Sequence, residues 1–132
     1  MNIIEFFDQN WQLQKWQQGF SKRERTLLTG LSGTAKSLVM ANAYENVAEK
    51  YIIVTDSQFH ANELYDELST LLGEEKVFQF FSDDNIYAEF ALASKDRVAY
   101  RLEALNFLLD EKSTGFLVVP FLALRSYLPS PE

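Results

Sequence analysis

The sequence predicts an α/β fold in which a mainly parallel sheet lies between two layers of helices. Apolar, largely β-branched runs at residues 51–55 and 116–119 are typical of buried strands. Amphipathic stretches long enough for helices separate such runs, and crossover helices of this kind make successive strands parallel. The chain has 132 residues, of which 47% are hydrophobic, so it can build a sizeable core.

The first 25 residues predict a helical lead-in, and residues 26–132 predict a single α/β domain. Asn2 and Glu5 have the spacing of a capping box, and aromatic side chains follow at helical intervals. We expect a short strand at residues 26–29, then a glycine-containing loop and a helix that is buried over a wide face.

The strand at residues 51–55 is predicted to be covered on both faces, because its apolar run is continuous. Asp56 or Ser57 can cap the helix that follows, and Gly73 is placed to end it. The predicted buried face of this helix comprises Ala61, Leu64, Leu68 and Leu71.

The remaining elements are a strand at residues 77–81, an irregular stretch, a long helix and a final strand that stops at Pro120. Ser94 is the expected cap of the long helix. A short last helix is expected to run to Pro129. The predicted buried face of the long helix comprises Val98, Leu102, Leu105 and Leu109.

The segment GLSGTAKS, residues 30–37, differs by one residue from the phosphate-binding pattern GxxxxGK[ST]. In that pattern backbone N–H groups surround the phosphates, the lysine reaches the terminal phosphates and the hydroxyl holds Mg²⁺. Ala35 occupies the second glycine position, and its methyl group crowds a backbone that must approach phosphate closely. The candidate cofactor-binding residues are those of this degenerate phosphate loop, Gly30, Gly33, Thr34, Lys36 and Ser37, and neither ATP nor Mg²⁺ is predicted as a bound cofactor.

The order of strand, GLSGTAKS loop and helix, followed by IIVTDSQFHANELYDEL and FLVVPFLALRSYLPSPE, resembles the first part of a superfamily 2 helicase motor of the P-loop class. From about Thr26 onward it is most similar to domain 1a of the excinuclease B component and to the related N-terminal module of bacterial transcription-repair coupling factors. The excinuclease B component has a glycine in place of Ala35 and a tyrosine-rich hairpin in place of residues 80–87. These two departures favour the coupling factor.

The resemblance implies a fragment of a larger multidomain protein that serves as a non-catalytic structural and interaction module. It implies that the parent protein translocates on DNA with a motor located elsewhere and releases stalled RNA polymerase during nucleotide excision repair. It also implies contacts with other domains of the parent, and recruitment of the excinuclease A component mainly through the domain that would follow.

The alternative is a functional nucleotide-binding domain of a P-loop ATPase or helicase, because the ending Ala-Lys-Ser also resembles the loop of some active AAA-type ATPases. Hydrolysis needs an acidic residue after a strand to hold Mg²⁺. Asp56 is the one candidate by position, and a helix cap is its favoured role. Asp66–Glu67 and Asp110–Glu111 fall within or at the end of helices, where solvated charge is expected, so no catalytic or metal-binding residue is predicted.

A formal net charge of −7, from 19 acidic and 12 basic residues, argues against a third possibility, a fragment that simply binds DNA. The densest basic cluster is Lys22, Arg23 and Arg25, which either touches DNA or a neighbouring domain or forms an exposed linker. Arg97 and Arg101 share a helix face and either grip an acidic partner or solvate the helix. The stretch at residues 82–90 is either a docking edge or a surface left open by missing neighbours.

The absence of cysteine excludes disulfides and thiolate metal sites, and the one histidine, His60, is expected to be an exposed helix residue. The sequence shows no secretory leader and no apolar run near the roughly 20 residues that span a bilayer. We therefore expect a soluble, cytoplasmic protein without membrane contact.

Overall fold

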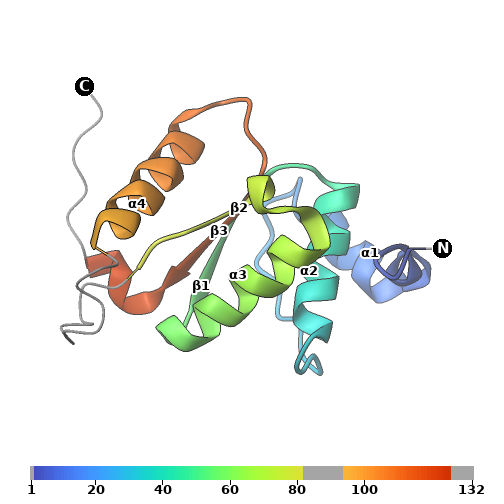
Figure 1. Ribbon diagram of the computed structural model, residues 1–132. Coiled ribbons are helices and arrows are strands. Elements are labelled where there is room, and N and C mark those ends of the chain that lie inside the picture. Colours follow the sequence, from blue (N-terminus) through green and yellow to red (C-terminus); the bar gives the residue numbers. More distant parts are fainter. Residues whose placement is uncertain (1, 82–93, 126–132) are drawn as a thin grey trace. The chain divides into compact units, whose positions relative to one another are not determined.

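Residues 2–81 and 94–125 are described by a computed structural model (Figure 1). The chain divides into two compact units. We call Met1–Glu49 the N-terminal unit and Lys50–Glu132 the C-terminal unit, and describe each by itself. The boundary expected between residues 25 and 26 stays a prediction. In the described ranges, no helix combines the length and apolar character needed to cross a membrane.

The described part of the C-terminal unit contains a three-stranded parallel sheet in the order β1-β3-β2. Its strands are β1 (Lys50–Thr55), β2 (Val77–Gln79) and β3 (Gly115–Pro120). The central strand, β3, is buried along its whole length, as expected for a strand with a partner on each side and helices above and below. The predicted α/β class with a parallel sheet is confirmed for this unit.

Helices α3 (Gln58–Leu72) and α4 (Ser94–Leu109) lie on opposite faces of this sheet (Figure 1). Leu117 and Val119 of β3 pack with α4, so the alternate residues, Phe116 and Val118, project toward the face that α3 covers. The 3₁₀ helices η2 (Glu74–Lys76) and η4 (Phe121–Arg125) complete the described part of the unit. The helix end predicted at Pro129 lies outside the described residues.

The predicted limits and buried face of α3 are confirmed. Ser57 caps its start, and Gly73, with a φ of 97°, follows its last residue. Ala61 and Leu68 are fully buried, while the other two residues of the predicted face are half-buried.

The predicted buried face of α4 is wrong. Leu102 is 56% exposed, and Val98 and Leu109 are exposed too, whereas Ala104 and Phe107 are buried. Phe107 stacks on Phe78 of β2, with 4.5 Å between ring centroids. The helix has two apolar stripes. The stripe that packs on the sheet contains Phe107, whose ring packs against Phe78 of β2. The proposed capping role of Ser94 concerns a side chain outside the described set.

The prediction that β1 is covered on both faces is also wrong within this unit. Ile52 and Val54 are both more than half exposed. They lie on the face of the sheet that α4 covers, but β1 is an edge strand and α4 packs on β2 at the opposite edge. The apolar run therefore predicts the strand correctly, but it does not show that both faces of the strand are covered.

The N-terminal unit contains η1 (Glu5–Gln9), α1 (Trp11–Gln18) and α2 (Ala35–Asn46). Asn10 interrupts the helical lead-in because its backbone is extended and its side chain caps α1, accepting hydrogen bonds from two backbone N–H groups. Of the capping box expected at the start, one bond is present: the backbone N–H of Asn2 donates to Glu5 Oε2 at 3.3 Å. Oδ1 of Asn2 accepts from the backbone N–H of Ile4 and not from that of Glu5, and the residue before η1 is Ile4, which makes no side-chain capping bond.

The strand predicted at residues 26–29 is absent. This segment has no ladder of strand hydrogen bonds, and Leu27 is 88% exposed. A β-strand forms only where the backbone pairs with a neighbouring strand. The residue types at 26–29 favour an extended backbone, but the sequence of this segment does not determine whether a partner strand lies beside it.

Candidate functional site

The loop before α2 bends through two glycines in the left-handed region. Gly30 has a φ of 85° and Gly33 a φ of 56°, values that residues with a side chain rarely adopt. Helix α2 begins at Ala35, so Lys36 and Ser37 lie in its first turn. The end of the motif thus stands at a helix N-terminus, where backbone N–H groups lack partners inside the helix.

Two backbone N–H groups of the motif are already hydrogen-bonded within the loop. The N–H of Ala35 donates to the carbonyl oxygen of Ser32 at 3.3 Å, and that of Lys36 donates to Gly33 at 3.4 Å. These contacts close local turns. An incoming phosphate has to displace them before it can use those two N–H groups.

The side chains of the motif differ sharply in exposure. Lys36 and Thr34 are exposed, whereas Ser37 is 0% exposed. Magnesium bound to a nucleotide takes one ligand from this hydroxyl position. Because the hydroxyl of Ser37 is packed away from solvent, the residues present fit an anion beside Lys36 better than they fit a magnesium–nucleotide complex.

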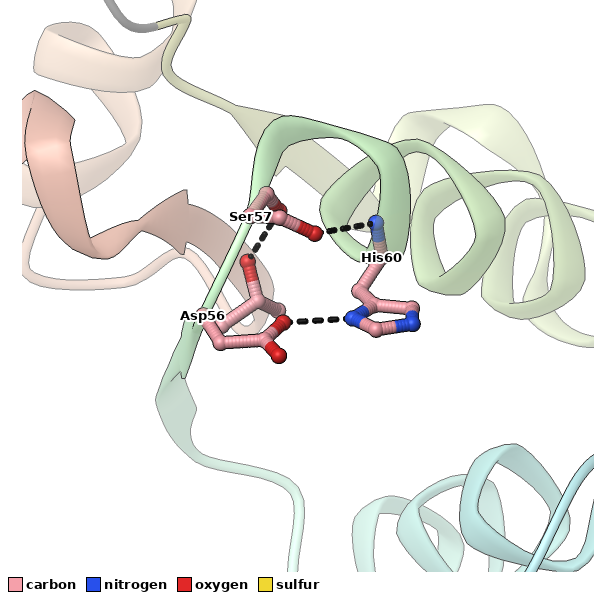
Figure 2. A network of polar contacts seen from close by, with 4 residues as sticks. Asp56, Ser57 and His60 are labelled. Atoms are coloured by element: carbon pink, nitrogen blue, oxygen red, sulfur yellow. Dashed lines mark hydrogen bonds and ion pairs between the residues drawn. The ribbon is translucent and has the colours of Figure 1, made fainter.

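Asp56, the candidate magnesium ligand by position, is paired with His60 (Figure 2). Its Oδ1 lies 2.5 Å from Nδ1 of His60, one turn into α3. The hydroxyl of Ser57 accepts a hydrogen bond from the backbone N–H of His60 at 3.2 Å, so Ser57 rather than Asp56 is the helix cap.

The hydrogen bond with His60 is the main reason why the pKa of the Asp56 carboxyl lies below its usual value. Both side chains are exposed, as predicted for His60. Among the described residues, no group of three or more His, Cys, Asp or Glu side chains could hold a metal ion.

The two pairs of acidic residues lie within or at the end of helices, as predicted from the sequence. Asp66–Glu67 is inside α3, and Asp110–Glu111 follows the end of α4. Oδ1 of Asp110 accepts a hydrogen bond from the backbone N–H of Lys112 at 3.0 Å, so this carboxylate stabilises the turn after the helix.

The basic cluster of Lys22, Arg23 and Arg25 is exposed, and Arg23 has a positive φ of 53°. Arg101 is half-buried in α4. The side chain of Arg97 and the stretch at residues 82–90 lie outside the described set.

A polar network inside the N-terminal unit was not predicted from the sequence. Asn42, in the middle of α2, is 1% exposed and donates hydrogen bonds to Ile4 and Asp8 of the first helical segment. Asn46, one turn later, also donates to Asp8. The sequence signal that could have indicated this network is a pair of asparagines, four residues apart, in a helix otherwise predicted to be buried over a wide face.

Together, these features define an α/β protein with a glycine-containing loop at the start of a helix. The transcription-repair-coupling factor of Bacillus subtilis strain 168 is 35% identical to the chain over 107 residues, or 80% of this chain and 9% of that protein. That of Staphylococcus aureus strain bovine RF122 is 28% identical over 107 residues, or 81% and 9%. No protein-family model and no solved structure matches.

The chain belongs to the family of transcription-repair-coupling factors, and the resemblance in the sequence is confirmed. The match is consistent with an N-terminal domain of that factor. The chain spans about a tenth of the length of the curated relatives it matches, 9% of each.

Proposed function

We propose that this chain is a non-catalytic structural and interaction module of a transcription-repair-coupling factor. Membership of the family supports the parent identity. The observation that carries the non-catalytic part is the state of the loop, in which Ser37 is fully buried and two N–H groups are engaged internally. A loop that hydrolyses ATP needs this hydroxyl on magnesium and these N–H groups on phosphate.

The parent protein is proposed to act on DNA and on stalled RNA polymerase in transcription-coupled repair, in the bacterial cytoplasm. Its motor lies in other domains, and the excinuclease A component is recruited mainly through the domain after this one. Within such a protein, this module contacts neighbouring domains. These assignments follow from the family resemblance.

The test is a calorimetric titration of the chain with Mg²⁺–ATP, run beside Lys36→Ala and paired with an assay for released phosphate. Lys112→Ala, an exposed lysine in the other unit, is the matched control. We expect no saturable heat and no phosphate release from any of the three proteins.

Turnover that requires Lys36 and Mg²⁺ would overturn the non-catalytic proposal in favour of the functional nucleotide-binding domain. Saturable binding without turnover, lost only in Lys36→Ala, would leave the module non-catalytic and make it a nucleotide sensor. The exposure of Lys36 at a helix N-terminus is the observation that favours this second function.

A further inference from the structure

The carboxylate of Asp8 sets the orientation of the amides in the polar network of the N-terminal unit. A carboxylate only accepts hydrogen bonds, so Asn42 and Asn46 both turn Nδ2 toward Asp8 Oδ1, at 2.7 and 2.9 Å. These bonds, the one from Asn46 first, hold the pKa of Asp8 below its usual value. Nδ2 of Asn42 also donates to the carbonyl of Ile4 at 3.0 Å, which fixes that amide from a second side.

Gln17 and Gln14 continue the same pattern. Nε2 of Gln17 donates to Oδ1 of Asn42 at 2.8 Å, and its Oε1 accepts from Nδ2 of Asn46 at 3.1 Å. Nε2 of Gln14 donates to the backbone carbonyl of Asp8. Both asparagine side-chain amides therefore direct their N–H groups into the network.

A pocket of about 420 Å³ lies beside this network, within the N-terminal unit. Its volume is in the range of small-molecule sites, about 300–1,000 Å³. Its lining includes Asp8, Gln17, Asn46, Glu49 and Phe20. Among the residues that the structure describes, none that lines it is a lysine, arginine or histidine.

The charged residues that line the pocket, Asp8 and Glu49, are both acidic. Within residues 2–81 and 94–125, neither Asp8 nor Glu49 forms an ion pair. The field extends to Glu45 on α2, where burial raises the pKa and the carboxylates of Glu5 and Asp8 raise it further. A ligand that brings only donors and a positive charge satisfies such a lining.

We propose that this pocket binds the guanidinium group of an arginine side chain presented by a partner polypeptide. Guanidinium is a donor-only cation with five N–H groups, so it can meet several acceptors at once. Its plane can also stack on an aromatic ring such as Phe20, which a lysine ammonium does less well. A free arginine is disfavoured because its own carboxylate would face Asp8 and Glu49, with no basic residue among the described lining residues.

This site is separate from the loop at residues 30–37, and the inference holds whether or not that loop binds nucleotide. The test uses the full chain and nuclear magnetic resonance titration. The probes are a short peptide with blocked ends and one central arginine, the same peptide with citrulline or lysine, and free arginine. Citrulline keeps the shape of arginine and removes its charge.

We expect the arginine peptide to cause saturable shifts at the backbone amides of Phe20, Ser21 and Val47, and the citrulline peptide to cause none. Lysine should bind more weakly than arginine. Glu49→Gln should weaken arginine binding by about threefold or more, because it removes one of two charges from the lining without touching the network. Glu63→Gln, an exposed acid on α3, should change nothing.

Three results would overturn the proposal: no saturable shift with the arginine peptide, equal shifts with citrulline, or unchanged affinity in Glu49→Gln. Tighter binding of free arginine than of the blocked peptide would overturn the assignment of a polypeptide partner. Because Glu49 lies outside the hydrogen-bonded network, Glu49→Gln is expected to fold, and its amide spectrum checks this directly.

Discussion

Ser57 and Thr34 both stand at the start of a helix, yet only Ser57 caps one. Ser57 has an extended backbone, with φ −149° and ψ 160°, which directs its hydroxyl to the N–H three residues on. Thr34 already has helical dihedral angles, φ −64° and ψ −18°, and its side chain makes no capping bond. The start of α2 is held instead by the carbonyls of the preceding loop, which is why its N–H groups are partly occupied.

We predict that His60→Ala raises the pKa of the Asp56 carboxyl toward its ordinary value, because the hydrogen bond that lowers it is lost. The folded pKa of Asp56 is depressed, so its contribution to stability is present above the unfolded pKa, near 4. That contribution disappears as the pH falls through the folded pKa. Carbon-detected nuclear magnetic resonance titration of the aspartate carboxyls measures this directly.

Asp8 is the internal control for that titration, since its pKa is lowered by Asn46 and Asn42 instead. Its titration should be the same in both proteins. If the pKa of Asp56 were also unchanged in His60→Ala, the contact in Figure 2 would have no energetic weight.

At the scale of elements, α4 has two apolar stripes, of which one packs on the sheet. The rings of Phe107 and Phe78 are nearly parallel, at 22°, and Ala104 beside them is fully buried. A small residue next to a large one lets a helix approach the strand closely while the ring fills the remaining space. Leucines on the other stripe keep most of their surface exposed.

Phe107→Ala is therefore expected to lower the free energy of unfolding by about 3–5 kcal/mol, because it leaves a cavity against β2. Leu102→Ala, in the same helix but exposed, is expected to change it by no more than about 0.5 kcal/mol. Urea denaturation followed by circular dichroism compares the two. A larger loss in Leu102→Ala than in Phe107→Ala would restore the face predicted from the sequence.

The elements of the C-terminal unit could be predicted from the sequence because their apolar runs and end residues are local properties. Three predictions were wrong: the strand at residues 26–29, the buried face of α4 and the two covered faces of β1. Each depends on which other element packs against the segment, and the local sequence pattern does not contain that information. The candidate loop shows the same limit. Its sequence motif indicates phosphate binding. The burial of Ser37 depends on how α2 packs in the folded chain, which the motif does not determine.

At the scale of the whole molecule, the division into two units places every described strand in the C-terminal unit. The residues that join the units, 47–49, follow the end of α2 and precede β1. Ala48 and Glu49 are exposed. Such junctions are where chains are open to proteases.

We predict that a glutamate-specific protease under native conditions cuts after Glu49 well before it cuts after Glu67, which is half-buried within α3. A protease needs an extended, accessible backbone, and a residue inside a packed helix offers neither. Mass spectrometry of timed samples identifies the sites. Cleavage at Glu67 as fast as at Glu49 would contradict the division at this junction.

Within residues 2–81 and 94–125, the order β1-β3-β2 means that each outer strand pairs with β3 alone, which comes after both of them along the chain. During synthesis, the backbone groups of β1 and β2 must therefore wait for residues 115–120 to leave the ribosome. Long-range pairing of this kind is slow, and unpaired apolar strands attract one another between molecules. A chain truncated before Gly115 keeps β1 and β2 but loses the strand with which each of them pairs, and it should aggregate rather than accumulate as a smaller folded protein.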